Sequence, residues 1–454
     1  KDTNYLKDKF KSCPKMGLKN NGETFYMNSI LQCFSHITKF VEFFKYNPQI
    51  KDTVKKNKNN EENLSVSFKT LIDNLWPDNL NQSTKKYYSP DDFKNKIFKM
   101  NPLFNDYKSN NIKDLIQFII MTLHKELNKA EKNKNDTFNE MVQSDKKSIF
   151  DFYNQEFARN NNSIISNLFF AINCRGAQCP KCNNQMFNFQ TYFYLIFPLE
   201  KIIQFKNSNM NMNNQNNNSN SFKNNIQNQF YNYMNNIQIL YNNYITNIQN
   251  SFNELNANEK NQLDSFLMNQ NNDFKNYISN QQRNYNNMIM NNQQDLSNNN
   301  NINNNEVNIY DCFEYYRKIN YMTGDDAMYC KLCKTTTNFC SRTDLTTGPE
   351  VLLIILNKSK QTNGNIKFNF WEYLNLFNYI EFKDFGFNYR LIGVIISFLE
   401  SEKQNVVAYC IDPISEKWYK YHDEIVSEVN DFQKEIINSS TPDLLIYEKL
   451  NNFI

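Results

Sequence analysis

Two long segments of the chain differ in the spacing of their apolar residues, and this difference predicts the order of the elements. In the first segment, residues 15 to about 160, apolar side chains recur three or four positions apart, the period of a helix with one buried face. The pattern is clearest over residues 114–127 and in a stretch that begins at Tyr26 and continues through Met27, Ile30, Leu31, Phe34 and Ile37. Turn residues precede this stretch at 20–22. We therefore expect a mainly helical first part, in which a loop leads into the helix at Tyr26.

The second segment has the shorter period of β-strands. After residue 164, aromatic and β-branched side chains nearly alternate with polar ones, and this indicates a strand through Phe187, Phe189, Tyr192, Tyr194 and Ile196. Residues 351–356 form a continuous apolar run of strand length. Further strands are expected at residues 389–395, 406–410 and 417–421, so that the β-rich part reaches about residue 448. Helices followed by strands predict an α+β fold.

Residues 207–308 interrupt this order, and Asn207 and Asn308 are expected to flank neighbouring strand ends. Asn accounts for 41 of these 102 residues, and neither Gly nor Pro occurs. Such a composition is typical of a disordered tract. Apolar side chains nevertheless recur at helical spacing from Ile226 to Leu255 and more loosely from Leu263 to Met288. The insertion is therefore predicted to be either disordered or a helical hairpin, and the hairpin would depend on packing of its apolar stripe because Asn is a poor helix former.

The overall composition limits the classes of function. A chain of 454 residues, 40% of them hydrophobic, can bury a large core. The net charge of +3 gives no general attraction to nucleic acid or to a membrane surface, and no apolar run reaches transmembrane length. We expect protein partners, with no nucleic acid and no membrane. Because residue 1 is Lys, we expect the sequence to be a fragment or a processed product.

The ten cysteines are spaced for metal binding rather than for a disulfide framework. Cys179 and Cys182 form one C-x-x-C pair, and Cys330 and Cys333 form another. Each pair can present two thiolates to one metal ion, and four thiolates suit a tetrahedral structural zinc. This use of cysteine favours a reducing compartment, the cytoplasm or the nucleus. The alternative is that these cysteines bind no metal. The remaining cysteines are expected to pack as small hydrophobic residues: Cys13, Cys33, Cys174, Cys312, Cys340 and Cys410.

The loop and helix at residues 17–33 read G-L-K-N-N-G-E-T-F-Y-M-N-S-I-L-Q-C. This stretch resembles the cysteine box of the ubiquitin-specific proteases, the papain-like deubiquitinases, which reads roughly G-L-x-N-x-G-x-T-C-Y-M-N-S-x-L-Q-C. Phe25 stands where the family has its nucleophilic cysteine. The S-P element at residues 88–90, the helix from Asp114 and both C-x-x-C pairs match further family elements in order. The resemblance covers roughly residues 15–200 and 309–448.

The resemblance implies the hand-shaped fold of this family, with a helical thumb, a β palm and β fingers whose tips hold a structural zinc. It also implies ubiquitin or a ubiquitin-like protein as partner, with the ubiquitin tail between thumb and palm. Asp114 matches an acidic residue that would face the tail, whereas Gln117 replaces the family's Glu. The implied divisions are an extension (1–14), the thumb (15–163), a first part of fingers and palm (164–206), the insertion (207–308), a second part of the fingers (309–345), the palm (346–448) and a tail (449–454).

The resemblance also indicates that the chain lacks the catalytic triad. The family's histidine in G-H-Y-x-A-Y is Asn405 here, and the family's third triad residue, after W-x-x-F, is His422. The upstream H-x-G is replaced by residues 397–399, Ser-Phe-Leu. A cysteine protease needs a thiol and a base beside it, and neither Phe25 nor Asn405 supplies one. Asn20 matches the family's oxyanion-hole residue and is expected to be kept for loop structure.

The leading hypothesis is a pseudo-deubiquitinase that binds ubiquitin or a ubiquitin-like protein, or that scaffolds a complex. One alternative is an active cysteine deubiquitinase with a displaced nucleophile, although Cys33 should be buried about 12 Å further along the helix and His422 would have no thiol partner. Another is a structural subunit without ubiquitin binding, which Gln117 and the degraded strand ending at residues 357–359 favour. His36 and His124 are expected to be ordinary helix residues.

Overall fold

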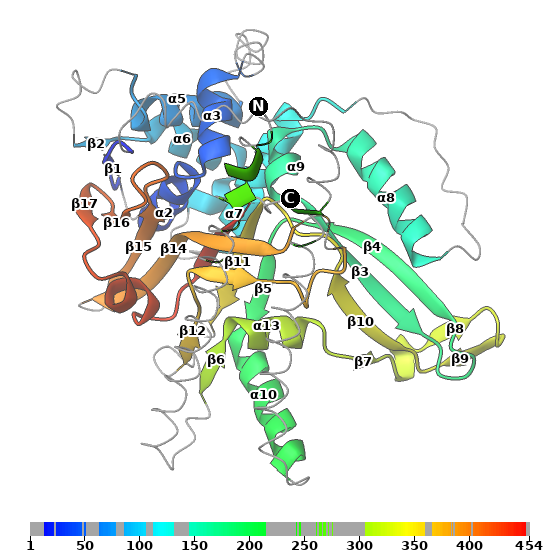
Figure 1. Ribbon diagram of the computed structural model, residues 1–454. Coiled ribbons are helices and arrows are strands. Elements are labelled where there is room, and N and C mark those ends of the chain that lie inside the picture. The colour runs from blue at the N-terminus through cyan, green and yellow to red at the C-terminus, as the bar shows by residue number, and fades with distance from the viewer. Residues whose placement is uncertain are drawn as a thin grey trace. The chain divides into compact units, whose positions relative to one another are not determined.

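The computed structural model describes residues 13–21, 24–47, 63–78, 86–105, 112–130, 145–214, 305–358, 366–382, 386–400 and 403–450, together with positions 50 and 384 and several single positions between 242 and 275 (Figure 1). The chain divides into two compact units, one of residues 1–203 with 305–452 and one of residues 204–304 with the last two residues. Among the described residues, no helix combines the length and the apolar character needed to cross a membrane.

The first part of the chain is helical, as the apolar period predicts. Its helices are α2 (Phe25–Phe34), α3 (Thr38–Tyr46), α5 (Leu64–Leu75), α6 (Asp91–Met100), α7 (Ile112–Leu127), α8 (Lys146–Asn160) and α9 (Ile164–Phe169), with a 3-10 turn η2 (Pro102–Asn105). A short parallel pair, β1 (Gly17–Leu18) and β2 (Tyr87–Tyr88), joins the start of the chain to this part. We call these helices the thumb. Residues 164–169, which the sequence analysis assigned to the β-rich part, form its last helix.

Helix α2 packs against another thumb helix, α7, and against strands from the C-terminal part of the chain. Its apolar spacing predicts an amphipathic helix, but all ten of its residues are buried. The polar ones are accommodated by partners from distant segments: Gln32 Nε2 donates to the carbonyl of Met16 at 2.9 Å, and Ser29 Oγ contacts the carbonyl of Val406 at 3.5 Å. Buried polar groups are tolerated when they find such partners. The helix therefore binds the N-terminal segment on one side and a β-sheet on another.

The palm is one mixed sheet in the C-terminal part of the chain. Its strand order is β17 (Ile425–Glu428), β16 (Trp418–His422), β15 (Lys403–Ile411), β14 (Asn388–Glu400), β18 (Leu444–Lys449), β11 (Val351–Asn357) and β5 (Leu195–Pro198), and β13 (Tyr373–Asn375) also pairs with β14. The first six residues of β11 are buried, as expected for a continuous apolar run in a sheet covered on both faces. Strands β14 and β15 form a regular hairpin up to the pair Glu400 and Lys403.

The fingers are a second, four-stranded sheet in the order β4 (Gln185–Tyr192), β3 (Ala171–Gln178), β10 (Cys340–Leu345) and β7 (Asn320–Tyr321). A small hairpin of β8 (Met328–Cys330) and β9 (Thr335–Thr337) lies at their end (Figure 1). Phe150 of α8 packs against Cys174 and Phe189 on one face of the sheet. The single strand predicted through residues 187–196 is wrong, because it divides between β4 of the fingers and β5 of the palm.

The insertion begins differently from the prediction, whereas its last residue lies at a strand end as expected. Asn207 was expected at a strand end, but it lies inside helix α10 (Leu199–Asn214). Asn308 does end a strand, β6 (Glu306–Asn308), which pairs in parallel with β12 (Lys367–Asn369). It also caps helix α13 (Ile309–Tyr316) by accepting hydrogen bonds from two backbone N–H groups. The choice between disorder and a helical hairpin for the insertion falls mostly outside the described residues.

Candidate functional site

The loop before α2 is fastened to the turn between β16 and β17. The backbone N–H of Asn20 donates to Glu424 Oε1 at 3.0 Å, and its side-chain Nδ2 donates to Asp423 Oδ2 at 2.9 Å. The Asn20 side-chain oxygen accepts from the N–H of Thr24 at 2.9 Å. Asn20 matches the family's oxyanion-hole position, yet its polar groups are engaged within the protein. These hydrogen bonds connect the loop to the β16–β17 turn and to the residue before α2.

Asp423 is the centre of this network. Its second oxygen accepts from Asn28 Nδ2 at 2.7 Å, and its carbonyl accepts from the N–H of Leu18 at 2.8 Å. Its backbone is left-handed, with φ of 50°, a conformation that Asp tolerates better than most residues. Burial raises the pKa of its carboxyl, and the hydrogen bonds from Asn28 and Asn20 oppose that shift. A Cβ on Gly17 would lie 2.6 Å from the Asp423 carbonyl oxygen, so only glycine fits there.

Lys94 of α6 holds the same loop through hydrogen bonds of its side-chain ammonium group. It is 2% exposed, and its Nζ donates to Thr24 Oγ1 at 2.6 Å and to the carbonyl of Lys19 at 2.9 Å. Burial lowers its pKa to about 8, while the charges of Asp423, Asp91 and Glu424 act in the opposite direction. The loop that would shape an oxyanion site is thus held by a buried lysine and by the β16–β17 turn.

Phe25 is the first residue of α2, directly after this loop. Its side chain is 8% exposed and meets the ring of Tyr26 edge to face, with centroids 6.3 Å apart. Tyr26 in turn contacts the carbonyl of Phe104 with its hydroxyl at 3.4 Å. At the position where the family has a thiol, this chain therefore has a buried aromatic side chain that packs with its neighbour.

The other two triad positions lie on adjacent strands of the palm. Asn405 of β15 pairs with Phe398 of β14, and the Phe398 ring lies 6.4 Å from the ring of His422 at the end of β16. Residues paired across neighbouring antiparallel strands share one face of the sheet. The structure thus places Asn405 and His422 on one face of the sheet, where the ring neighbour of His422 is Phe398, a side chain with no ionisable group.

The displaced-nucleophile candidate, Cys33, lies on the side of α2 that packs against β15. Cys33 is 2% exposed, as predicted, and its Sγ lies 3.8 Å from Cys410 Sγ. Burial raises the pKa of the Cys410 thiol well above its usual value, and the neighbouring Cys33 thiol adds to the shift. A neutral thiol in a closed core is a poor nucleophile. Cys13, assigned to the extension, is also buried and donates its backbone N–H to Asp412 Oδ2 at 3.0 Å.

His36 and His124 are structural, although His36 lies in the turn between α2 and α3 and not in a helix. His36 Nδ1 lies 2.7 Å from the carbonyl of Gln32, and its Nε2 lies 2.9 Å from the Tyr421 hydroxyl. A carbonyl can only accept, so Nδ1 carries the hydrogen and Nε2 accepts from Tyr421. Burial lowers the pKa of His36 to about 4. His124 Nδ1 contacts Ser163 Oγ at 2.8 Å, and burial lowers its pKa as well.

An apolar groove of about 930 Å³ runs along the outer face of α7 beside η2. Asp114, Gln117, Phe118 and Met121 line it, together with the strongly exposed Leu103, which is 76% accessible. The two residues predicted to face a ubiquitin tail thus share one groove. Gln117 Oε1 accepts a hydrogen bond from the Tyr194 hydroxyl at 2.9 Å. Asp114 is close enough for its charge to raise the pKa of Tyr194, after burial as the main cause.

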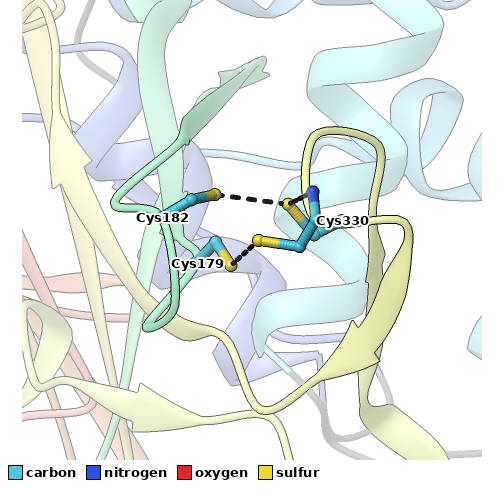
Figure 2. A group of neighbouring side chains, drawn as sticks. Cys179, Cys182 and Cys330 are labelled. Atoms are coloured by element: carbon cyan, nitrogen blue, oxygen red, sulfur yellow. Dashed lines mark hydrogen bonds between the residues drawn. The ribbon is translucent and has the colours of Figure 1, made fainter.

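The two C-x-x-C pairs meet at the end of the fingers. The sulfurs of Cys179, Cys182, Cys330 and Cys333 all lie within 4.8 Å of one another, and Figure 2 shows three of them labelled, facing each other from two loops. Cys179 and Cys333 are 3.9 Å apart at Sγ, and Cys182 and Cys330 are 3.6 Å apart. Asn183 and Lys334 follow the pairs in left-handed conformation, so both loops turn back sharply. Four thiols so placed could hold one metal ion, and all-sulfur donors suit zinc.

Sequence reasoning missed the residues that hold the site together. Asp423 and Glu424 directly follow the His422 position, but their contacts with residues 18–28 join the two ends of the chain. Lys94 belongs to a helix that reads as an ordinary amphipathic one. The only sequence signal was the acidic pair at a hairpin turn, a place where charged residues are common without a special role.

Comparison with solved structures gives the fold. The SAGA DUB module Ubp8/Sgf11/Sus1/Sgf73 bound to ubiquitin aldehyde contains a chain that superposes with a TM-score of 0.53 at 16% identity, covering 97% of this chain and 70% of that one. A related structure of this module, bound to monoubiquitin, gives a TM-score of 0.54 with the same coverage. At this identity the likeness speaks for the fold alone. It confirms the predicted α+β hand of thumb, palm and fingers.

Comparison of sequences gives the family. Residues 16–236 and 189–447 match the family described as "Ubiquitin carboxyl-terminal hydrolase". Ubiquitin carboxyl-terminal hydrolase 9 of Arabidopsis thaliana is 29% identical over 198 residues, which are 40% of this chain and 20% of that protein. Ubiquitin carboxyl-terminal hydrolase 15 of Homo sapiens is 26% identical over 186 residues, which are 40% of this chain and 18% of that protein. The chain therefore belongs to the ubiquitin carboxyl-terminal hydrolase family, and its matches span about a fifth of the length of these curated relatives.

Proposed function

We propose that the chain is a catalytically inactive ubiquitin-specific protease domain that binds ubiquitin or a ubiquitin-like protein, or that scaffolds a complex. The observation that carries this proposal is the occupation of the three family triad positions by Phe25, Asn405 and His422. Isopeptide hydrolysis by a cysteine protease needs a thiolate, a base that activates it and a group that orients the base. A phenyl ring has no nucleophilic atom, and a side-chain amide is no base near neutral pH.

An active deubiquitinase with a displaced nucleophile is the first alternative. Cys33 lies on the same helix as Phe25, but it is buried against Cys410 at two turns' distance from the helix start. Cys182 is exposed, but it belongs to the four-cysteine cluster. His422 has Phe398 as its ring neighbour. These environments support inactivity.

Binding of ubiquitin is supported by the groove on α7 and by the surface of the fingers. The tail of ubiquitin is basic and glycine-rich, and Asp114 offers the groove a carboxylate. Gln117 offers an amide where the family has a second carboxylate, and charge-assisted pairs are the stronger ones. We therefore expect weak binding, on the order of micromolar or worse. Exposed apolar side chains at Ile319, Tyr321, Tyr329 and Leu332 of the fingers are consistent with a protein-binding surface.

The fingers are proposed to hold one structural zinc through Cys179, Cys182, Cys330 and Cys333, without a part in chemistry. Burial works to raise the pKa of Cys179, but hydrogen bonds from the N–H groups of Cys182 and Lys181 and from neighbouring thiols lower it to about 7. A lowered pKa favours the thiolate that a metal requires. A metal here would join two loops that are far apart in the sequence. We propose the cytoplasm or nucleus as the location, because these thiols must stay reduced.

The test is a calorimetric titration of the chain with ubiquitin, paired with labelling by an electrophilic ubiquitin probe. We expect weak binding and no adduct. Asp114→Ala should weaken binding if the tail enters the groove, and Phe25→Ala or Phe25→Gly should strengthen it by opening the path to the start of α2. Thr122→Ala, in the same groove but without charge, is the matched control.

The outcomes distinguish the proposed inactive ubiquitin-binding domain from its two alternatives, an active deubiquitinase and a structural subunit. An adduct on any cysteine would make the chain an active deubiquitinase. Absence of binding, or binding that none of these substitutions changes, would favour a structural subunit whose tail channel is unused. The likeness to a chain of the SAGA DUB module makes assembly with other proteins a natural setting for either inactive reading.

A further inference from the structure

A second pocket lies at the base of the fingers. Unlike the apolar groove on α7 it is polar, and it shares no residue with the thumb–palm site. Its volume is about 230 Å³. Its charged lining consists of Lys146, Arg317, Arg342, Asp344 and Glu381, and the turn at residues 378–380 completes it. Lys146 begins α8, Arg317 follows α13, and Arg342 and Asp344 belong to β10. Four separate segments thus converge on one hollow.

The pleat of the fingers sheet explains why these charges meet. Arg342 and Asp344 are two residues apart on β10, so they project from the same face. Arg342 pairs with Gly176, which pairs with Phe187 on the next strand, so Phe187 shares that face as well. Lys146 Nζ lies 5.2 Å from the centre of the Phe187 ring. The helix therefore brings its lysine over the face from which the arginine projects.

The cations are held in place by the protein before any ligand arrives. Asp344, whose side chain is only 15% exposed, accepts from Arg317 Nε with one oxygen and from Arg342 Nε with the other, both at 2.9 Å. Arg317 Nη1 also donates to the carbonyl of Asn378 at 2.8 Å. Lys146 Nζ pairs with Glu381 Oε2 at 2.6 Å. Side chains fixed in this way lose little further conformational entropy when they bind.

These hydrogen bonds do not use all the N–H groups of the three cations. Both Nη groups of Arg342 and the Nη2 group of Arg317 make no hydrogen bond to the described residues, and Lys146 uses one of its three N–H groups. Three cations against two carboxylates leave the pocket with one net positive charge. Guanidinium groups bind the oxygens of phosphate in pairs, so the spare donors suit an anion with several oxygens.

The size of the pocket limits the ligand. Its 230 Å³ lies below the range of roughly 300–1,000 Å³ that sites for whole small molecules occupy. It suits a charged group presented by a larger molecule. A phosphate dianion gains more than a single carboxylate from the net positive charge of this pocket, because the Coulomb energy grows with the charge of the ligand. We infer that this pocket binds the phosphate of a phosphorylated serine or threonine on a protein partner, independently of the proposed ubiquitin binding.

The experiment is a calorimetric titration of the full chain with a short alanine- and glycine-based peptide carrying one phosphoserine. The same peptide with serine, the same peptide with glutamate, and inorganic phosphate serve as comparison ligands at constant ionic strength. We expect a dissociation constant on the order of millimolar for the phosphopeptide. Arg342→Gln and Arg317→Gln should each weaken it about tenfold.

Arg175→Gln is the matched control, because Arg175 belongs to the same sheet but projects from its opposite face. It should leave phosphopeptide binding unchanged, and equal melting temperatures of the variants would show that folding is intact. The inference is overturned if Arg342→Gln has no effect, if the glutamate peptide or inorganic phosphate binds as tightly as the phosphopeptide, or if no binding is detected. Ubiquitin binding measured in the same variants should not change.

Discussion

Asn20 and Asp423 are separated by 403 positions in the sequence, yet the amide of one donates to the carboxylate of the other at 2.9 Å. This bond and its neighbours fasten the loop before α2 to the turn after β16. They engage the backbone N–H and both side-chain polar atoms of Asn20, so these groups are not directed at a reaction site. The thumb and the palm are thus joined at the place where the family resemblance positions its chemistry.

Removal of Asp423 should loosen this junction. Asp423→Ala removes the carboxylate that accepts from the amides of Asn20 and Asn28, and the loss of a partly buried charged acceptor should cost about 1–3 kcal/mol of unfolding free energy. Urea unfolding followed by circular dichroism measures this difference. Asp326→Ala is the control, because Asp326 is an exposed acid of the fingers. A loss no larger than that of the control would mean that the bond contributes nothing.

A thiol alone should not restore catalysis. Phe25→Cys places the family's nucleophile at the start of α2, but Asn405 leaves it without a base. We expect no hydrolysis of a fluorogenic ubiquitin substrate by the single variant, and turnover above background only when Asn405→His is added. Turnover by Phe25→Cys itself would show that another group of this chain acts as the base.

The four-cysteine cluster should contain one zinc per chain. Elemental analysis of the purified protein measures it directly. Replacement of Cys182 or Cys333 by Ser should release the metal and unfold the end of the fingers, because metal binding and local folding are coupled. Cys340→Ser is the control, since Cys340 lies nearby on β10 but outside the cluster. Much less than one zinc in the unmodified chain would contradict the proposal.

His36 should make the fold sensitive to acid. Its pKa falls from 6.5 to about 4 on folding, so the unfolded chain takes up a proton at higher pH than the folded chain does. The neutral form is therefore favoured in the folded state, and its stability should decline as pH falls from about 6.5 to about 4, by about 3 kcal/mol in all. Asp412 and Lys15 are the charges nearest to it, and they act in opposite directions.

The measurement is the unfolding free energy at several pH values in this window, for the unmodified chain and for His36→Gln. The difference between the two proteins isolates the histidine, because all other titrating groups are shared. The advantage of the unmodified chain should shrink steadily toward pH 4. A difference that does not change with pH would mean that His36 titrates alike in both states.

The insertion should be dispensable for the unit of residues 1–203 and 305–452. Deletion of residues 215–304 keeps α10 and the cap residue Asn308, and the deleted segment belongs to the second unit. We expect the melting transition of the remaining protein to stay within a few degrees. A chain that no longer folds would indicate that the insertion stabilises the first unit.

Several features could be predicted from the sequence because they depend on neighbours in the chain. The apolar period of residues 26–37 and 114–127 identified α2 and α7, and the uninterrupted apolar run at 351–356 identified β11. C-x-x-C spacing identified two pairs that the fold brings within 4.8 Å. Motif order identified the family, because such motifs are short and contiguous.

Other features were decided only by the tertiary structure. Local alternation could not show that residues 187–196 divide between two sheets, because a strand reads alike in either. Composition could not place Asn207 inside a helix, because Asn is common both within α10 and in the sequence that follows it.

The candidate site shows the same division. The proposed assignment of Phe25, Asn405 and His422 to the triad positions rests on the sequence by itself, since it depends on single residues within short motifs. Only the tertiary structure decided what Asn20, Lys94 and Asp423 do, because each finds its partners in a distant segment. The charges at the base of the fingers likewise acquire a common pocket only when four segments fold together. Long-range contacts of this kind leave no periodic trace in the chain.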